Sequence, residues 1–84
     1  MNEAKVFFAL SDPTRLKIVK ILLGGEKCAC LIPPLVLRAQ PTVSLQLKKL
    51  VGAGIISFRK EGTYVVYFIK NKKIAKLVED AGKI

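Results

Sequence analysis

The sequence contains no histidine and no tryptophan, and it has only two cysteines and six acidic residues among its 84 residues. Without histidine, the chain lacks the commonest general base and the commonest ligand of transition metals. The carboxylates are scattered, and only Glu79 and Asp80 are adjacent, on what reads as a solvated helix face. Neither a phosphate-binding glycine loop nor a nucleophile-elbow motif occurs. We therefore predict that the chain is not an enzyme.

Long hydrophobic runs are also absent. The longest strongly apolar stretch, Leu31 to Leu37, has seven residues and includes two prolines, whereas a membrane-spanning helix needs about 20. The first residues are polar and are not followed by the apolar run of a secretory signal. Cys28 and Cys30 are one residue apart, so a bond between them would close a very small loop and stabilise the fold little. These features predict a cytoplasmic protein with reduced thiols and no membrane partner.

Positive charge is abundant and unevenly distributed. Lysine and arginine number 15, which gives a formal charge of +9. Between Lys27 and Lys76 there are ten basic residues and one acid, Glu61, while the rest of the chain is balanced. In addition, 51% of the residues are hydrophobic and the mean hydropathy is +0.37, which is more apolar material than one small core requires. The combination predicts a basic face for a polyanion and an apolar face for a second subunit.

The spacing of apolar residues predicts a single domain, residues 1–84, that is mainly α-helical with a small β-hairpin. Helices are expected over 4–10, from Asp12-Pro13 to Gly24-Gly25, from Gln40 to Val51, and after Asn71. Residues 28–32 are expected to be extended or irregular, with a short helix from Pro33 or Pro34 to Leu37. Two β-branched and aromatic runs, 55–60 and 63–69, meet at Glu61-Gly62 and predict the hairpin.

The second helix has an apolar stripe that predicts its buried face, made by Leu16, Val19, Leu22 and Leu23. Its basic residues are expected to lie mostly on the opposite, solvated side, and they are Arg15, Lys17 and Lys20. In the helix from Gln40, the same reasoning assigns Val43, Leu47 and Leu50 to the core.

A short helix, a tight turn and a second helix with a polar first half indicate a helix-turn-helix, and a hairpin directly after it indicates a wing. A winged helix-turn-helix binds double-stranded DNA, and here no cofactor is required for that binding. Gln40 could contact adenine, Ser44 either kind of base, and Leu45 a thymine methyl group. Lysine and arginine side chains would contact phosphates. The predicted DNA contacts are Gln40, Pro41, Thr42, Ser44, Leu45, Lys48, Lys49, Arg59 and Lys60.

Five segments resemble the arsenic-repressor (ArsR/SmtB) family: Asp12-Pro13-Thr14-Arg15-Leu16, Ala39-Gln40-Pro41-Thr42-Val43-Ser44, Leu47-Lys48-Lys49-Leu50, Ala53-Gly54-Ile55 and Arg59-Lys60-Glu61-Gly62. The resemblance covers about residues 4–70 without gaps. It implies a homodimeric winged-helix repressor that leaves its operator when a metal or metalloid binds. It also implies a dimer formed by the first and last helices, where we expect the interface residues Val6, Phe7, Leu10, Ile74, Leu77, Val78 and Ala81.

The resemblance also implies that the helix from Gln40 to Val51 is the recognition helix, and the chain departs from the family pattern near it. Ala39 stands where the family commonly has serine, which forfeits about 1 kcal/mol of helix capping. Leu37 stands where the family often has glycine or another small residue, and leucine is costly in a left-handed conformation. Two prolines interrupt a segment that the family usually keeps helical, and Leu45 replaces a frequent histidine. The operator preference therefore cannot be transferred from the family.

Cys28-Ala29-Cys30 resembles the Cys-x-Cys element of the family's arsenite- and cadmium-type sensors. Side chains at i and i+2 diverge on a regular helix but point the same way in an extended segment. The prolines favour the extended form, and Lys27 is expected to lower the thiol pKa. Because the chain offers two sulfurs and no histidine, As(III) or Sb(III) suits this pair better than Zn(II). A third sulfur would come from an exogenous thiol or the partner subunit.

Three hypotheses for the cysteines remain open at this point: soft-metal or metalloid sensing, a reversible dithiol redox switch, and no sensory role, since free cysteine is often simply a core residue. If the pair does bind an inducer such as As(III), Sb(III) or another thiophilic ion, the short helix that follows would shift. That shift would move the recognition helix it supports and change the spacing of the two half-site readers.

Overall fold

Helices make up the first half of the chain, and most of the sheet follows them. The computed structural model describes residues 2–83. In chain order the elements are α1 (Glu3–Leu10), α2 (Pro13–Leu23), β1 (Lys27–Cys28), a 3₁₀ turn (Ala29–Leu31), α3 (Ile32–Val36), α4 (Gln40–Gly52), β2 (Ile56–Glu61), β3 (Tyr64–Ile69) and α5 (Lys72–Ala81). Helices α3 and α4 form the predicted helix-turn-helix, and the β2–β3 hairpin forms the wing.

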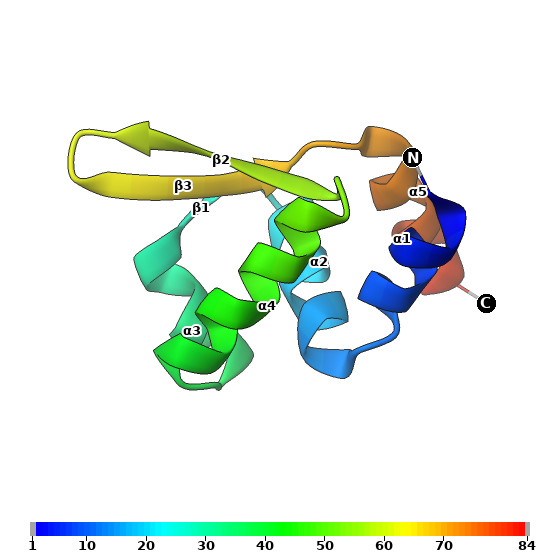
Figure 1. Cartoon of the computed structure of the whole chain (residues 1–84), viewed down its shortest axis with the longest axis horizontal. Coiled ribbons are helices and arrows are strands. Elements are labelled where there is room, and N and C mark those ends of the chain that lie inside the picture. The colour runs from blue at the N-terminus through cyan, green and yellow to red at the C-terminus, as the bar shows by residue number, and fades with distance from the viewer. Residues whose placement is uncertain (1, 84) are drawn as a thin grey trace.

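The elements divide between two ends of the molecule (Figure 1). Helices α1 and α5 lie together at one end, and the β2–β3 hairpin projects from the opposite end. Between them, α2 packs against α1, α3, α4 and α5. Within the described residues, no helix is long and apolar enough to cross a membrane.

Local capping signals set the helix starts as predicted. The Asp12 carboxylate accepts the backbone N–H of Arg15 at 3.0 Å, directly before Pro13. The Asn71 side-chain oxygen accepts the N–H groups of Lys73 and Ile74 at 3.1 and 3.2 Å. These contacts satisfy first-turn donors that have no partner inside the helix. At α4 the cap residue is Ala39, which makes no side-chain hydrogen bond, so the expected loss of capping is confirmed.

The sheet has three antiparallel strands in the order β1-β3-β2. The hairpin register ends with Glu61 opposite Tyr64, and Gly62 in the turn has a φ of 61°, which glycine adopts without steric cost. The predicted hairpin is therefore confirmed. Strand β1 was not predicted, because its two residues are too few to show the alternation that identifies a strand.

The segment around the prolines differs in part from expectation. The chain is extended only as far as Cys28, and a 3₁₀ turn then leads into α3, which begins at Ile32 rather than at a proline. Pro33 and Pro34 fit because N–H groups in the first turn of a helix have no intrahelical partner. Helix α3 ends at Val36, and its C-cap residue Leu37 has left-handed φ and ψ of 57° and 46°. The strain anticipated for a leucine in this turn is thus present.

One core joins all five helices to the sheet. The recognition helix contributes the three residues predicted for it, Val43, Leu47 and Leu50, all nearly inaccessible to solvent. The other buried members of the cluster are Val6, Ala9, Ile18, Val19, Leu22, Ile32, Val36, Ala53, Ile55, Ile56, Ile74 and Val78. In α2 the buried face is rotated from the predicted stripe, because Ile18 is fully buried while Leu16 and Leu23 are only partly so.

Arg15 corrects the sequence-based expectation most clearly. It was assigned to the solvated side of α2, but it is only 5% exposed. Its Nε donates to the Ala9 carbonyl at 2.7 Å, and one Nη donates to the Gln46 side-chain oxygen at 2.7 Å. The other Nη donates to the Phe8 carbonyl at 3.3 Å. The end of α1 presents carbonyl groups that lack intrahelical donors, and the arginine satisfies them while reaching α4.

We predict that Arg15→Ala lowers the free energy of unfolding by about 3 kcal/mol, because it removes a buried cation that donates to the Ala9 carbonyl and the Gln46 side chain. The Phe8 carbonyl keeps the backbone N–H and the hydroxyl of Ser11 as donors. Lys17→Ala, an exposed change in the same helix, should alter that free energy by less than about 0.5 kcal/mol. Urea denaturation of both variants checks this. Equal effects of the two substitutions would contradict the role given to Arg15.

Candidate nucleic-acid interface and thiol pair

Helix α4 presents an exposed stripe on the side away from its core residues. Helical geometry places i, i+4 and i+8 close together, so Gln40, Ser44 and Lys48 follow one line, with Pro41 and Leu45 beside it. All five are exposed, and Leu45 keeps 51% of its surface accessible. A leucine this open at the start of a well-packed helix contributes little to the fold, so its side chain is available to a partner.

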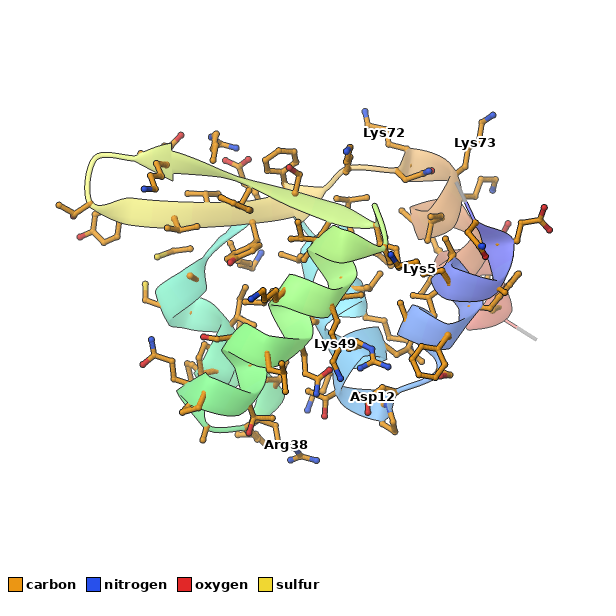
Figure 2. The ribbon with its side chains drawn as sticks, viewed as in Figure 1. Lys5, Asp12, Arg38, Lys49, Lys72 and Lys73 are labelled. Carbon is orange, nitrogen blue, oxygen red and sulfur yellow. The ribbon has the colours of Figure 1, made fainter. Side chains whose placement is uncertain are left out.

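Two of the predicted DNA contacts lie on another flank of α4. Lys49 lines a shallow cavity of about 340 Å³ with Lys5 and Phe8 of α1, and Figure 2 shows Lys49 on the side of α4 that faces α1. Thr42, seven residues earlier, shares this flank because seven residues are close to two helical turns. Both are exposed, and because they are three and four residues from Leu45 they adjoin the exposed stripe along its edge toward α1.

On the wing, the two predicted phosphate contacts are in different surroundings. Lys60 is exposed. Arg59 makes a two-pronged ion pair with Glu26, with N–O distances of 2.6 and 2.7 Å, and its Nε donates to Glu61 at 2.9 Å. The hydrogen bond from Arg59 lowers the pKa of Glu26, and the two carboxylates raise the pKa of Arg59. Two neighbouring carboxylates thus compensate its charge at the protein surface, where the Arg59 and Glu26 side chains are 40% and 52% exposed.

The thiols of Cys28 and Cys30 are in direct contact, with their sulfurs 2.6 Å apart, and both are free cysteines. Cys28 closes β1, and Cys30 lies in the 3₁₀ turn with its N–H 3.4 Å from the Cys28 sulfur. This turn brings the sulfurs together, where an extended chain had been expected to do so. Cys30 is exposed and Cys28 is half-buried. The pair is therefore open to a thiophilic ion.

The pKa of Cys30 differs from expectation. The hydrogen bond with Cys28 raises the pKa of Cys30 above its usual value, whereas Lys27 had been expected to lower the thiol pKa. The Lys27 ammonium instead donates to the Gly25 carbonyl at 3.2 Å. Among residues 2–83, no group of three or more histidine, cysteine or acidic side chains is placed to hold a metal ion. The protomer thus offers two sulfur ligands at this point.

The terminal helices leave apolar side chains uncovered. Phe7 and Leu77 are 59% and 45% exposed, and they border a cavity of about 330 Å³ that Leu10 and Ala81 also line. Three other residues expected at a dimer interface, Val6, Ile74 and Val78, are already buried in the core of the protomer. Fewer of the predicted interface residues are therefore exposed to a partner than the sequence indicated.

Two side-chain contacts between distant parts of the chain could not be predicted from the sequence. Arg15 and Gln46 are 31 residues apart, and Arg59 and Glu26 are 33 residues apart. No local periodicity connects such partners. The only available signal was Glu26 itself, an acidic residue just before the strongly basic region, and by itself it indicated no partner.

Comparison with known proteins agrees with this geometry. Residues 12–57 match the family model described as "Bacterial regulatory protein, arsR family". An uncharacterized HTH-type transcriptional regulator of Methanocaldococcus jannaschii is 44% identical, and the match covers 92% of this chain and 91% of that protein. A cadmium resistance transcriptional regulatory protein, a CadC homolog of Staphylococcus aureus, is 43% identical, with 96% and 68% covered.

A solved structure is similar over nearly the whole chain. It is the homodimeric winged helix-turn-helix DNA-binding domain of a possible ArsR-family transcriptional regulator from Mycobacterium bovis, with a TM-score of 0.88 and 30% identity. The match covers 94% of this chain and 73% of that one. The relatives are transcriptional regulators, which confirms that the protein is not an enzyme. On fold, family model and relatives together, the chain belongs to the arsR family of bacterial transcriptional regulators.

Proposed function

We propose that this protein is a homodimeric DNA-binding repressor that releases its operator when a soft metal or metalloid ion binds Cys28 and Cys30. The observation that carries the proposal is the contact between two free thiols, 2.6 Å apart, at the entrance to α3. Helix α3 packs against the recognition helix α4. Thiol chemistry at this position therefore acts one element away from the DNA-reading surface.

The DNA-reading surface consists of the exposed stripe of α4 and the wing. Gln40, Ser44 and Leu45 supply hydrogen-bonding and apolar groups suited to base edges in the major groove. Lys48 and Lys60 supply charges for phosphates. The formal charge of +9 adds a long-range attraction to DNA that weakens as salt rises.

The ligand chemistry favours a soft ion that accepts few sulfurs. Two thiols from one protomer suit As(III) or Sb(III), with a third sulfur from an exogenous thiol or from the partner subunit. The Staphylococcus aureus relative is named for cadmium resistance, and cadmium is also thiophilic. When the sulfurs bind one centre, the 3₁₀ turn between them must adjust, and α3 follows it directly in the chain.

A dithiol redox switch is the second candidate, and the same sulfur contact favours it. Oxidation by a peroxide would join Cys28 and Cys30 in a disulfide, and their two protons and two electrons would reduce the peroxide to water and an alcohol or a second water. The raised pKa of Cys30 disfavours the thiolate that both peroxide attack and ion binding use, so it does not separate the two candidates. Hydrogen peroxide and arsenite, compared in the same operator-binding assay, separate the two candidates.

The dimer is supported by the uncovered apolar surface on α1 and α5. Phe7 and Leu77 flank one cavity there, and the Mycobacterium bovis neighbour is homodimeric. A symmetric pair places two recognition helices on one side of the DNA and reads a palindromic site.

Salt dependence tests the DNA contacts. We predict that Lys48→Gln lowers the slope of log affinity against log salt by about 0.9, the value for one released counterion on duplex DNA. Arg59→Gln should leave that slope nearly unchanged, because two carboxylates already compensate its charge. Fluorescence anisotropy with an operator selected from random duplexes measures both slopes. If the slope falls equally in the two variants, Arg59 contacts a phosphate and this prediction is wrong.

Oligomeric state tests the apolar surface. Leu77→Glu should convert the dimer to a monomer in sedimentation velocity, because it places a charge in the proposed interface. Leu35→Glu is the matched control, since Leu35 of α3 is 47% exposed, close to Leu77, but lies on another element. A Leu77→Glu protein that remains dimeric would contradict this interface.

Cysteine substitution tests the sensor. We predict that arsenite weakens operator binding by the wild-type protein at least tenfold, within the roughly 5–150-fold range of allosteric coupling. Cys28→Ser and Cys30→Ser should each abolish the response while keeping the affinity of the ligand-free protein within about twofold. The measurement is operator anisotropy with and without arsenite. An unchanged wild-type affinity in arsenite would refute metalloid sensing.

A further inference from the structure

Glu26 and Arg59 form a link across one face of the sheet. Glu26 directly precedes β1, and Arg59 lies in β2, on the far side of the central strand β3. Both Glu26 oxygens are bound, at 2.6 and 2.7 Å. A two-pronged arginine–carboxylate pair has the strongest and most directional geometry open to an ion pair. The Arg59 guanidinium also lies 5.7 Å from the centre of the Phe68 ring.

The strand register places this link beside the thiol pair. Cys28 is opposite Val66 of β3, and Val66 is opposite Arg59 of β2, so the three residues form one row across the sheet. Directly opposed residues in antiparallel strands point to the same face. Arg59 therefore lies on the same face of the sheet as Cys28, and it binds the residue two positions before that cysteine.

The backbone alone holds the thiol segment weakly. Strand β1 contributes only Lys27 and Cys28 to the sheet, and two-residue pairing is too short to fix a segment firmly. The Glu26–Arg59 pair adds a side-chain connection from this segment directly to the wing. Glu61 holds the same arginine from within its own strand, which orients the guanidinium but does not reach β1.

We propose that Glu26 and Arg59 are positioning residues that couple the thiol pair to the wing. The proposal rests on the proposed function and adds a second route to the one through α3. When the sulfurs are drawn onto a soft ion, the backbone at Cys28 adjusts and displaces Glu26. Arg59 follows through its ion pair, and the orientation of the wing toward DNA changes. Arg59 acts here through the wing and not as a phosphate contact.

The test uses three full-length proteins: wild type, Glu26→Gln and Glu61→Gln. Glu26→Gln breaks the link between β1 and β2. Glu61→Gln is the matched control, because it removes the same charge from the same arginine but leaves the link intact. The probe is phenylarsine oxide, which binds two neighbouring thiols through two As–S bonds and releases one water. Hydrogen exchange of the wing amides and operator affinity are measured with and without the probe, and circular dichroism verifies folding.

In the wild type and in Glu61→Gln, the probe should change wing exchange and weaken operator binding at least tenfold. In Glu26→Gln, the exchange response should disappear and the affinity change should shrink severalfold, while the probe still occupies both thiols. If Glu26→Gln retains the wing response, or if the wild-type wing does not respond, the inference is overturned. Failure of the proposed function gives a different result. The probe then still changes wing exchange in the wild type and not in Glu26→Gln, but the wild-type operator affinity stays unchanged.

Discussion

The guanidinium of Arg15 is the interaction on which the rest of the arrangement depends. It satisfies two carbonyls at the end of α1 and the side chain of Gln46 in α4, and it does so almost fully buried. A buried cation persists only where its donors are satisfied, and a helix end supplies carbonyls that need donors. The helix that carries the proposed dimer surface is thereby fixed relative to the helix that reads DNA.

The thiol pair lies outside the group of helices that Arg15 joins. Beside α1, α2 and α4, which Arg15 joins, lie two short elements: the five-residue α3, followed by the left-handed Leu37, and the two-residue strand β1. Cys28 and Cys30 lie between these two parts. In the proposed mechanism, a change at the sulfurs passes to α4 through α3 and to the wing through Glu26 and Arg59. Both routes lead to surfaces that face DNA, while the central helices remain in place.

Much of this architecture could be predicted from the sequence, because its signals are local. Asp12 and Asn71 cap helices within three residues of themselves, Gly62 closes the hairpin, and Val43, Leu47 and Leu50 repeat at helical spacing. What could not be predicted depends on partners distant in the chain. Arg15 was expected to be exposed, and the ion pair of Arg59 with Glu26 was not foreseen, because neither Gln46 nor Glu26 is marked by any nearby pattern. The two thiols were expected to point the same way from an extended segment, but neither the 3₁₀ turn nor the direct sulfur contact that it creates was expected.

The central claim is that ion binding at the sulfurs and release of DNA are one event. The most direct measurement follows both in a single sample of reduced protein and fluorescent operator: sulfur–arsenic absorbance reports binding, and anisotropy reports release. The account predicts that the two signals change together as arsenite is added, with the same midpoint. Absorbance that reaches its plateau while the anisotropy stays at its DNA-bound value would contradict it.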